Sequence, residues 1–217
     1  MAIGARRADR LETLAKQLTE HGVRAVTIDL DVTDERACQA PVDTTLAALP
    51  SIDILVNAAG LMLLGRIVGA DTEDWRRSMS TNVLGLMYMT HAVVPHLLEQ
   101  GSGDVVNISS VAGRVARKGA GVYNASKWAV NAFSESLRQE VTGQGVRISL
   151  IEPGAVDTEL NEHITDQDAK KTAKDTYAAM RALQASDVAR AIRYVVTQPE
   201  HVAVNEILVR PTDQVQP

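Results

Sequence analysis

The chain has 217 residues, enough for one domain with a substantial core, and its 45% hydrophobic and 23% charged residues are typical of a globular protein. A net charge of -5 and only 3% aromatic residues argue against a nucleic-acid-binding surface. Cys38, the single cysteine, excludes an internal disulfide, and no Cys/His set suggests a metal site. No signal peptide or apolar run of spanning length is seen, so we expect a cytoplasmic protein without a membrane partner.

Apolar strand-like runs alternate with amphipathic helical patterns along the chain. Strands are predicted over residues 1–5, 23–28, 52–57, 105–109, 146–152 and 204–209. Helices are predicted over residues 9–21, 34–49 with a kink or break at Pro41, 71–99 as one broken or two successive helices, 121–142 and 186–197. Residues 158–184 are polar and are expected to form a helical flap. Strands rich in Val and Ile and separated by single helices predict an α/β fold with a doubly wound parallel sheet of the Rossmann type, as one domain over residues 1–217.

Tyr123 and Lys127 form the first candidate for catalysis. They are four residues apart near the start of a predicted helix, so both side chains lie on one face, a single turn apart. A free phenol has a pKa of roughly 10, and a nearby ammonium favours the phenolate and lowers that pKa. Such a phenol can serve as a general acid or base, although a Tyr and a Lys at this spacing are common in ordinary helices.

Other polar or small residues follow predicted strands, where a doubly wound sheet binds its ligands. Ser110 ends the fourth strand, and its hydroxyl can hold a substrate oxygen. Asn57, Ala58 and Gly60 follow the third strand, where small residues let a flat ligand approach the backbone. Each of these is also an ordinary turn by itself, as are Pro153-Gly154 after the fifth strand, Thr158 beyond it, and Asn82 inside a helical stretch.

The order of these residues is more specific than any of them alone. With Asn57-Ala-Ala-Gly60, Asn82, Ser110, Tyr123-x-x-x-Lys127 and Pro153-Gly154 followed by Thr158, the chain resembles the short-chain dehydrogenase/reductase family from residue 2 to its end. The stretches 61–65, 82–90, 131–141 and 207–215 make it similar to the branch that contains the clavulanate (clavaldehyde) dehydrogenase of Streptomyces.

The resemblance implies a role for each residue. Tyr123 would exchange the proton with the substrate oxygen, Lys127 would lower the Tyr123 pKa and bind the nicotinamide ribose, and Ser110 would hold the substrate oxygen. Asn82 would distort its helix and anchor a water leading to Lys127. The nicotinamide carboxamide would be held by Pro153, Gly154, the backbone near Val156, and Thr158.

Arg6 and Arg7 indicate which cofactor is used. They follow the strand 1–5, at the place where an acidic residue would bind the ribose of NAD and an Arg would accommodate the 2′-phosphate of NADP. Because Arg binds phosphate with bidentate geometry and full charge, NADP(H) is predicted. The resemblance also implies that Asp31 and Val32 contact the adenine.

The family's opening strand, Gly-rich turn and first helix are absent from the sequence, because residues 1–5 already read as the second strand. The absent strand would lie between the second and third, so at about 4.8 Å per strand its loss would leave a gap of roughly 9.6 Å. We expect that half of the sheet to shift or to be marginally stable, and we hypothesise a fragment or an incorrectly assigned gene start.

Three functions are carried forward. The first is an NADP(H)-dependent oxidoreductase that acts on a small carbonyl or alcohol. The second is a dehydrogenase of serine or 3-hydroxy acids, relatives of which share the ending 206–212, Glu-Ile-Leu-Val-Arg-Pro-Thr. The third is an inactive remnant that acts as a binding or scaffold protein. By analogy a homotetramer or dimer is expected, assembled through the predicted helices near 74–99 and 121–142.

Overall fold

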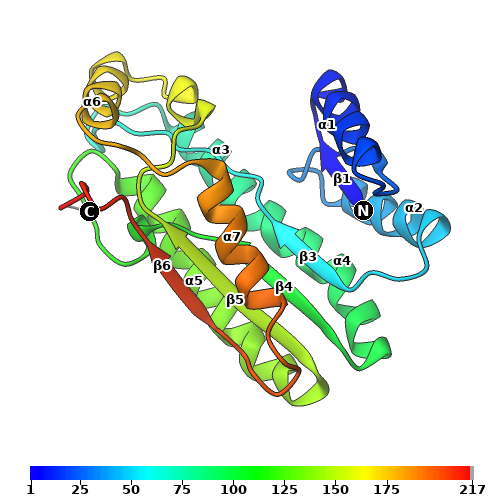
Figure 1. The fold of residues 1–217 in the computed structure, drawn as a ribbon. Helices are drawn as coiled ribbons and strands as arrows, with labels where there is room; N and C mark the ends of the chain where they lie inside the picture. Colours follow the sequence, from blue (N-terminus) through cyan, green and yellow to red (C-terminus); the bar gives the residue numbers. More distant parts are fainter. Residues whose placement is uncertain (216–217) are drawn as a thin grey trace.

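The computed structural model describes residues 1–215 and contains the predicted strands and helices in the predicted order (Figure 1). The strands are β1 (Ala2–Ala5), β2 (Val26–Asp29), β3 (Ile54–Asn57), β4 (Gly103–Ile108), β5 (Val146–Pro153) and β6 (Glu206–Val209). The helices are α1 (Ala8–Glu20), α2 (Ala40–Ala48), α3 (Thr72–Met79), α4 (Gly85–Gln100), α5 (Gly121–Val141), α6 (Gln167–Ala178) and α7 (Ala185–Val196). In the described part of the chain, no helix has the length and apolar character needed to cross a membrane.

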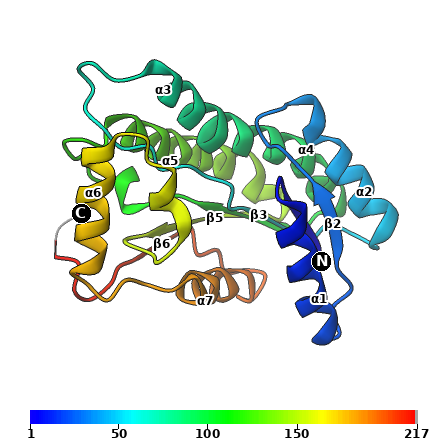
Figure 2. The same cartoon turned by 90° about the horizontal axis from the view of Figure 1, so that it is seen from above.

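All strand pairs are parallel, as the alternation of strands and helices predicts. The strands β3-β4-β5-β6 form one sheet, with helices α4 and α5 on one face and α7 on the other (Figures 1 and 2). The core on the first face joins apolar residues of the two helices to those of β4 and β5, and includes Val93, Leu97, Val105, Val141 and Ile148. On the second face, Val195 of α7 packs against Val106 and Ile151. The fold is Rossmann-like.

The sheet is not continuous. Strands β1 and β2 pair only with each other among the described residues, and they lie with α1 and α2 to one side of the larger sheet (Figure 1). Strand β3 is therefore an edge strand, and its Ile54 and Val56 side chains are 44% and 39% exposed. Parallel strands are usually covered on both faces, so this edge is unusually open for a parallel sheet.

Three element boundaries depend on particular side chains. Helices α3 and α4 are separated by a π-helical turn over Ser80–Leu84, which resolves the predicted broken helix into two. Pro41 lies in the first turn of α2 instead of kinking a longer helix, because a proline there lacks only an N–H that has no helical partner. Helix α7 begins at Ala185, one residue before the predicted start, because Gln184 and Asp187 form a capping box.

Candidate active site

A cavity of about 1440 Å³ lies at the carboxyl ends of β4 and β5, below the flap. Ten of the predicted site residues line it: Arg7, Ala58, Gly60, Ser110, Tyr123, Lys127, Pro153, Gly154, Val156 and Thr158. The apolar part of its wall comes from Met62 and Ala112 in the body and from Leu160 and Ala173 in the flap. Three of the predicted catalytic residues, Ser110, Tyr123 and Lys127, thus line the same cavity as the predicted flap.

Five predicted site residues do not line this cavity among the described residues: Arg6, Asp31, Val32, Asn57 and Asn82. Arg6 and Asp31 form an exposed ion pair at 3.8 Å. Val32 packs against the Cα of Gly85, where a Cβ would collide with it. Arg6, Asp31 and Val32 belong to the part of the molecule around β1 and β2, which pair apart from the larger sheet.

Asn57 is buried, and its side chain connects β3 to α4 and β4. Its amide nitrogen donates to Thr90 Oγ1 in α4 at 3.0 Å and to Asn107 Oδ1 in β4 at 2.9 Å. It therefore joins the end of β3 to a helix and a neighbouring strand.

Asn82 is 1% exposed and sits in the π-helical turn. Its side chain accepts from Leu61 N at 2.7 Å, donates to Leu61 O at 2.8 Å and donates to Ser126 Oγ at 3.0 Å. The π-helical turn at Asn82 agrees with the helix distortion that the family resemblance implies. Through Ser126, the bonds connect the loop after β3 to the helix that carries Tyr123 and Lys127.

Tyr123 lies in the first turn of α5 and is buried. Burial raises the pKa of its phenol to about 12, and a hydrogen bond from Ser110 acts in the opposite direction. The sequence argument expects a lowered pKa. In the structure, desolvation outweighs the groups that favour the phenolate, so Tyr123 is protonated at neutral pH.

Lys127 is buried beneath Tyr123. Its Nζ donates to Ile108 O at 2.8 Å and lies 5.9 Å from the centre of the Tyr123 ring. Burial lowers the pKa of the ammonium to about 8. The one-turn spacing therefore places the amine next to the phenol, as predicted.

Ser110 joins β4 to this pair. Its hydroxyl accepts from Ala112 N at 3.1 Å and is 3.4 Å from Pro153 O, so it caps the short 3-10 turn Val111–Gly113 and faces the end of β5. Its position next to Tyr123 fixes the two hydroxyls on one side of the cavity.

Glu152 is an important residue that the sequence analysis missed. It is 1% exposed at the end of β5, and its Oε1 accepts from Arg114 Nε and from Asn131 Nδ2, each at 2.7 Å. Arg114 also pairs with Glu206 of β6, and these carboxylates raise the pKa of its guanidinium. The network holds the loop after Ser110 against β5 and β6. The signal in the sequence that could have indicated this network is the acidic residue Glu152 within the apolar strand Val146–Pro153.

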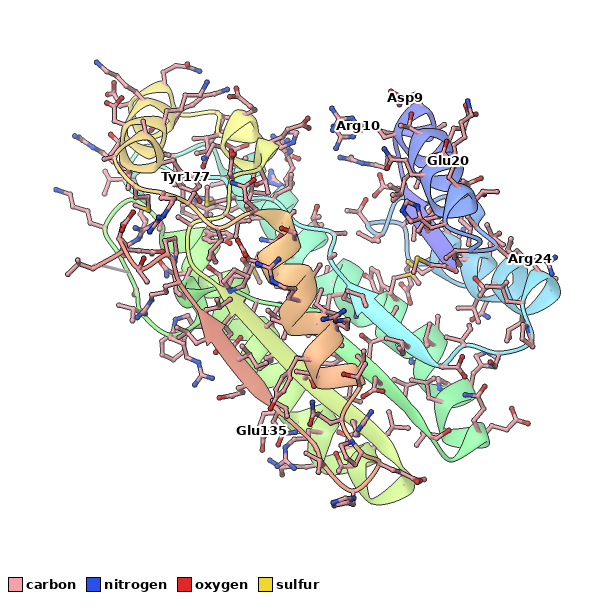
Figure 3. The ribbon with its side chains drawn as sticks, in the orientation of Figure 1. Asp9, Arg10, Glu20, Arg24, Glu135 and Tyr177 are labelled. Carbon is pink, nitrogen blue, oxygen red and sulfur yellow. The ribbon has the colours of Figure 1, made fainter. Side chains whose placement is uncertain are left out.

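The sequence analysis also missed an ion-pair bridge between the start of the flap and the α1 region. Glu159, at the start of the flap, pairs with Arg7 at 2.9 Å and with Arg10 at 2.7 Å, both in the α1 region. Figure 3 shows Arg10 on the side of α1 that faces the flap. Arg10 follows Arg7 by three residues and so shares its helix face, a signal that was available in the sequence.

The residues present fit a dinucleotide. Arg7 and Arg10 offer guanidiniums for a phosphate at one end of the cavity, and Lys127 and Ser110 offer donors at the other. The cavity lining also includes the small residues Ala58, Gly60 and Gly154. Donors at both ends of a small-residue wall match a long, flat ligand with a phosphate at one end.

A Rossmann-like sheet with a serine, a tyrosine and a lysine gathered at its carboxyl edge defines the class of dinucleotide-dependent oxidoreductases. Residues 1–169 match the short chain dehydrogenase family. The chain belongs to that family.

Relatives of this chain differ in the molecules they are named for. The chain is 41% identical over 217 residues to sulfoacetaldehyde reductase 2 of Chromohalobacter salexigens, covering 99% of this chain and 85% of that protein. It is 41% identical over 214 residues to the glycine betaine reductase ATRR of Emericella nidulans, of which it spans only 17%. A closed serine dehydrogenase complexed with NADP+ has 38% identity and a TM-score of 0.85, over 96% of this chain and 83% of that one. The narrower resemblance to clavaldehyde dehydrogenase is not among these findings and stays a prediction.

Proposed function

We propose that the protein is an NADP(H)-dependent oxidoreductase that transfers a hydride between the cofactor and a small carbonyl or alcohol, with Tyr123 as general acid and base. The observation that carries the proposal is that Ser110, Tyr123 and Lys127 line one cavity at the carboxyl ends of β4 and β5, with the Lys127 amine 5.9 Å from the centre of the Tyr123 ring. Two hydroxyls that meet at the end of a strand form a site that can bind one substrate oxygen from two sides.

The positions of Ser110 and Tyr123 allow each of them one role in the reduction. Ser110 donates a hydrogen bond to the carbonyl oxygen and orients it, and Tyr123 gives its proton to that oxygen as the carbonyl is reduced. The bound nicotinamide supplies or accepts the hydride. Because burial holds the pKa of Tyr123 near 12, the acid form predominates at neutral pH, which suits reduction. Oxidation needs the phenolate and is favoured as the pH rises.

The cofactor residues follow from the two ends of the cavity. Lys127 would bind the nicotinamide ribose, and Pro153, Gly154, Val156 and Thr158 would surround the carboxamide. Arg7 and Arg10 would hold the 2′-phosphate that distinguishes NADP from NAD. The serine dehydrogenase structure with NADP+ supports this choice. The roles first proposed for Arg6, Asp31 and Val32 rest on the family resemblance.

A hydroxy-acid dehydrogenase is the second candidate. The serine dehydrogenase relative supports it directly, and the sulfoacetaldehyde reductase also acts on a small oxygenated molecule with an acidic group. Glycine betaine reductase points to a different kind of molecule. The relatives therefore support the reaction class more strongly than any one substrate. A cytoplasmic homotetramer or dimer is proposed from the family resemblance, and light scattering of the purified protein tests its size.

The experiment is NADPH oxidation against a panel of aldehydes and ketones with wild type, Tyr123→Phe and Tyr194→Phe. Loss of the Tyr123 hydroxyl should lower kcat/KM by about 10²- to 10⁴-fold, the usual contribution of a general acid. Tyr194 is an exposed tyrosine of α7, so its variant should match wild type. Undiminished turnover by Tyr123→Phe would refute the role given to this residue.

A further inference from the structure

A carboxylate of the protein itself sits on the two arginines proposed to hold the cofactor phosphate. Glu159 Oε2 pairs with Arg7 Nη1 at 2.9 Å, and its Oε1 pairs with Arg10 Nη2 at 2.7 Å. All three side chains line the cavity, and Arg10 lies on the side of α1 that faces the flap (Figure 3). Two oxygens of a phosphate would bind these guanidiniums in the same way, one oxygen to each. Glu159 and the 2′-phosphate therefore need the same partners.

The surroundings of the Glu159 carboxylate favour an anion. Arg7 is the N-cap of α1 and Arg10 lies in its first turn, so the positive end of the helix dipole adds to the charge of the two guanidiniums. Hydrogen bonds from Arg10 and Arg7 lower the pKa of the Glu159 carboxyl to about 2. Glu159 is therefore ionised at neutral pH, and protonation does not release it from the arginines. Another anion can.

The ion pairs of Glu159 are open to exchange with such an anion. The side chains of Arg7, Arg10 and Glu159 are 56%, 53% and 51% exposed. Water screens ion pairs at this exposure, so each contributes little free energy. A phosphate monoester carries about 1.5 to 2 negative charges near neutral pH, against one for a carboxylate. The phosphate is thus the stronger partner for the arginines, and a carboxylate that stayed beside it would repel it.

Glu159 also connects α1 to the wall of the reaction centre. It begins the short 3-10 turn Glu159–His163, which the side-chain oxygen of Thr158 caps. Thr158 lines the cavity at the place proposed for the nicotinamide carboxamide. Directly after the turn, Ile164 is 2% exposed and packs in one buried cluster with Tyr123. A change at Glu159 therefore reaches the substrate end of the cavity over a few residues.

The base of the flap is held by bonds that do not involve Glu159. Asp157 N donates to Leu183 O at 2.7 Å, and Leu183 N donates to Ala155 O at 2.9 Å. These bonds join the two ends of the flap to each other beside the end of β5. Release of Glu159 from the arginines would therefore free the start of the flap from α1 without detaching its base.

We propose that Glu159 is a cofactor-specificity residue whose carboxylate competes with the 2′-phosphate of NADP(H) for Arg7 and Arg10. The phosphate displaces Glu159 and releases the start of the flap from α1. NAD(H) has a hydroxyl in place of this phosphate and leaves the ion pairs intact. This inference rests on the proposed NADP(H)-dependent function, and it couples movement of the flap to the phosphate that distinguishes the two cofactors.

The first test compares the affinities of NADPH and NADH by calorimetry. Glu159→Gln keeps the size of the side chain and removes the competing charge. The Kd for NADPH should fall by about three- to tenfold, and the Kd for NADH should stay within about twofold of wild type. An unchanged or higher Kd for NADPH, or an equal fall for NADH, would overturn the competition.

Glu162→Gln is the matched control for affinity. Glu162 is a flap glutamate of similar exposure, but its partners Lys170 and Lys174 lie within the flap. This variant should bind both cofactors as wild type does. A gain in NADPH affinity equal to that of Glu159→Gln would mean that any lost negative charge of the flap has the same effect, and the assignment to Glu159 would fail.

Hydrogen exchange of the segment 159–163, followed by mass spectrometry, tests the release of the flap. In wild type this segment should exchange at least about threefold faster with saturating NADPH than with saturating NADH, because only the phosphate displaces Glu159. Contacts to the nicotinamide are common to both cofactors and cancel in the comparison. In Glu159→Gln the bridge is already lost, so the two cofactors should give the same rate. Equal or slower exchange with NADPH in wild type contradicts the release.

Aldehyde reduction by the same proteins separates this inference from the proposed function. If Glu159→Gln binds NADPH more tightly but neither protein reduces any aldehyde, the oxidoreductase function fails and the competition stands. If both proteins reduce aldehydes with NADPH and share one Kd, the function stands and the competition fails. Undetectable NADPH binding by both proteins would overturn the competition together with the cofactor assignment.

Discussion

At the scale of single residues, the site combines two groups whose burial opposes their charged forms. Burial raises the pKa of Tyr123 and lowers that of Lys127, so both neutral forms are favoured relative to water. The spacing of four residues predicted that the two would meet. It did not predict the direction of the Tyr123 shift, because desolvation depends on the flap and the body closing around the phenol.

The lowered pKa of Lys127 predicts how stability changes with pH. The folded chain loses this proton near pH 8, whereas an unfolded lysine keeps it to about 10.5, so the unfolded state binds more protons in between. The free energy of unfolding should therefore rise with pH, by about 2 kcal/mol from pH 7.5 to 9.5. Lys127→Met should remove this rise.

Urea denaturation at several pH values measures the difference between wild type and Lys127→Met. The range stops below pH 10 because Tyr123, with its raised pKa, then acts in the opposite direction. Lys118→Met, at an exposed loop lysine, should keep the wild-type slope. The same slope in Lys127→Met and wild type would show that the ammonium is not desolvated.

At the scale of elements, ion pairs between segments far apart in the sequence hold the walls of the cavity together. The periodicity of apolar residues predicted the order of strands and helices because each pattern is local. Glu159 and Arg7 are 152 residues apart in the sequence, and nothing local indicates that they pair. The network of Glu152, Arg114 and Glu206 joins two strands and a loop in the same way.

The bridge between Glu159 and the α1 arginines predicts a local effect on the flap. Glu159→Gln removes the charge that Arg7 and Arg10 share, so hydrogen exchange should become faster in the flap segment 159–178. The melting temperature should hardly change because exposed ion pairs contribute little to global stability.

Glu162→Gln is the matched control for this prediction. Glu162 is an equally exposed flap glutamate, but its partners Lys170 and Lys174 lie within the flap itself. In that variant α1 and the start of the flap should stay bridged through Glu159. Identical exchange in Glu159→Gln and wild type would mean that the bridge does not order the flap.

At the scale of the whole molecule, the chain divides into two parts of unequal packing. Strands β4 and β5 are buried almost throughout, whereas β1 and β2 contain no fully buried residue. Helix α1 buries only Leu11. The sequence predicted these strands and a gap between the second and the third, and the structure pairs β1 and β2 separately from the larger sheet. The weakness expected of that half of the sheet stays a prediction.

This unequal packing predicts a gradient of stability across the molecule. Backbone amides of β1, β2 and α1 should exchange with solvent at least about 100-fold faster than those of β4 and β5, because local opening there exposes little apolar surface. Exchange followed by mass spectrometry on peptides from residues 1–30 and 103–153 measures the difference. Adding NADPH should slow the first set more than the second, since Arg7 and Arg10 would then be tied through the cofactor to residues of the larger sheet. Equal protection of both sets without cofactor would show that the β1–β2 part is as stable as the main sheet.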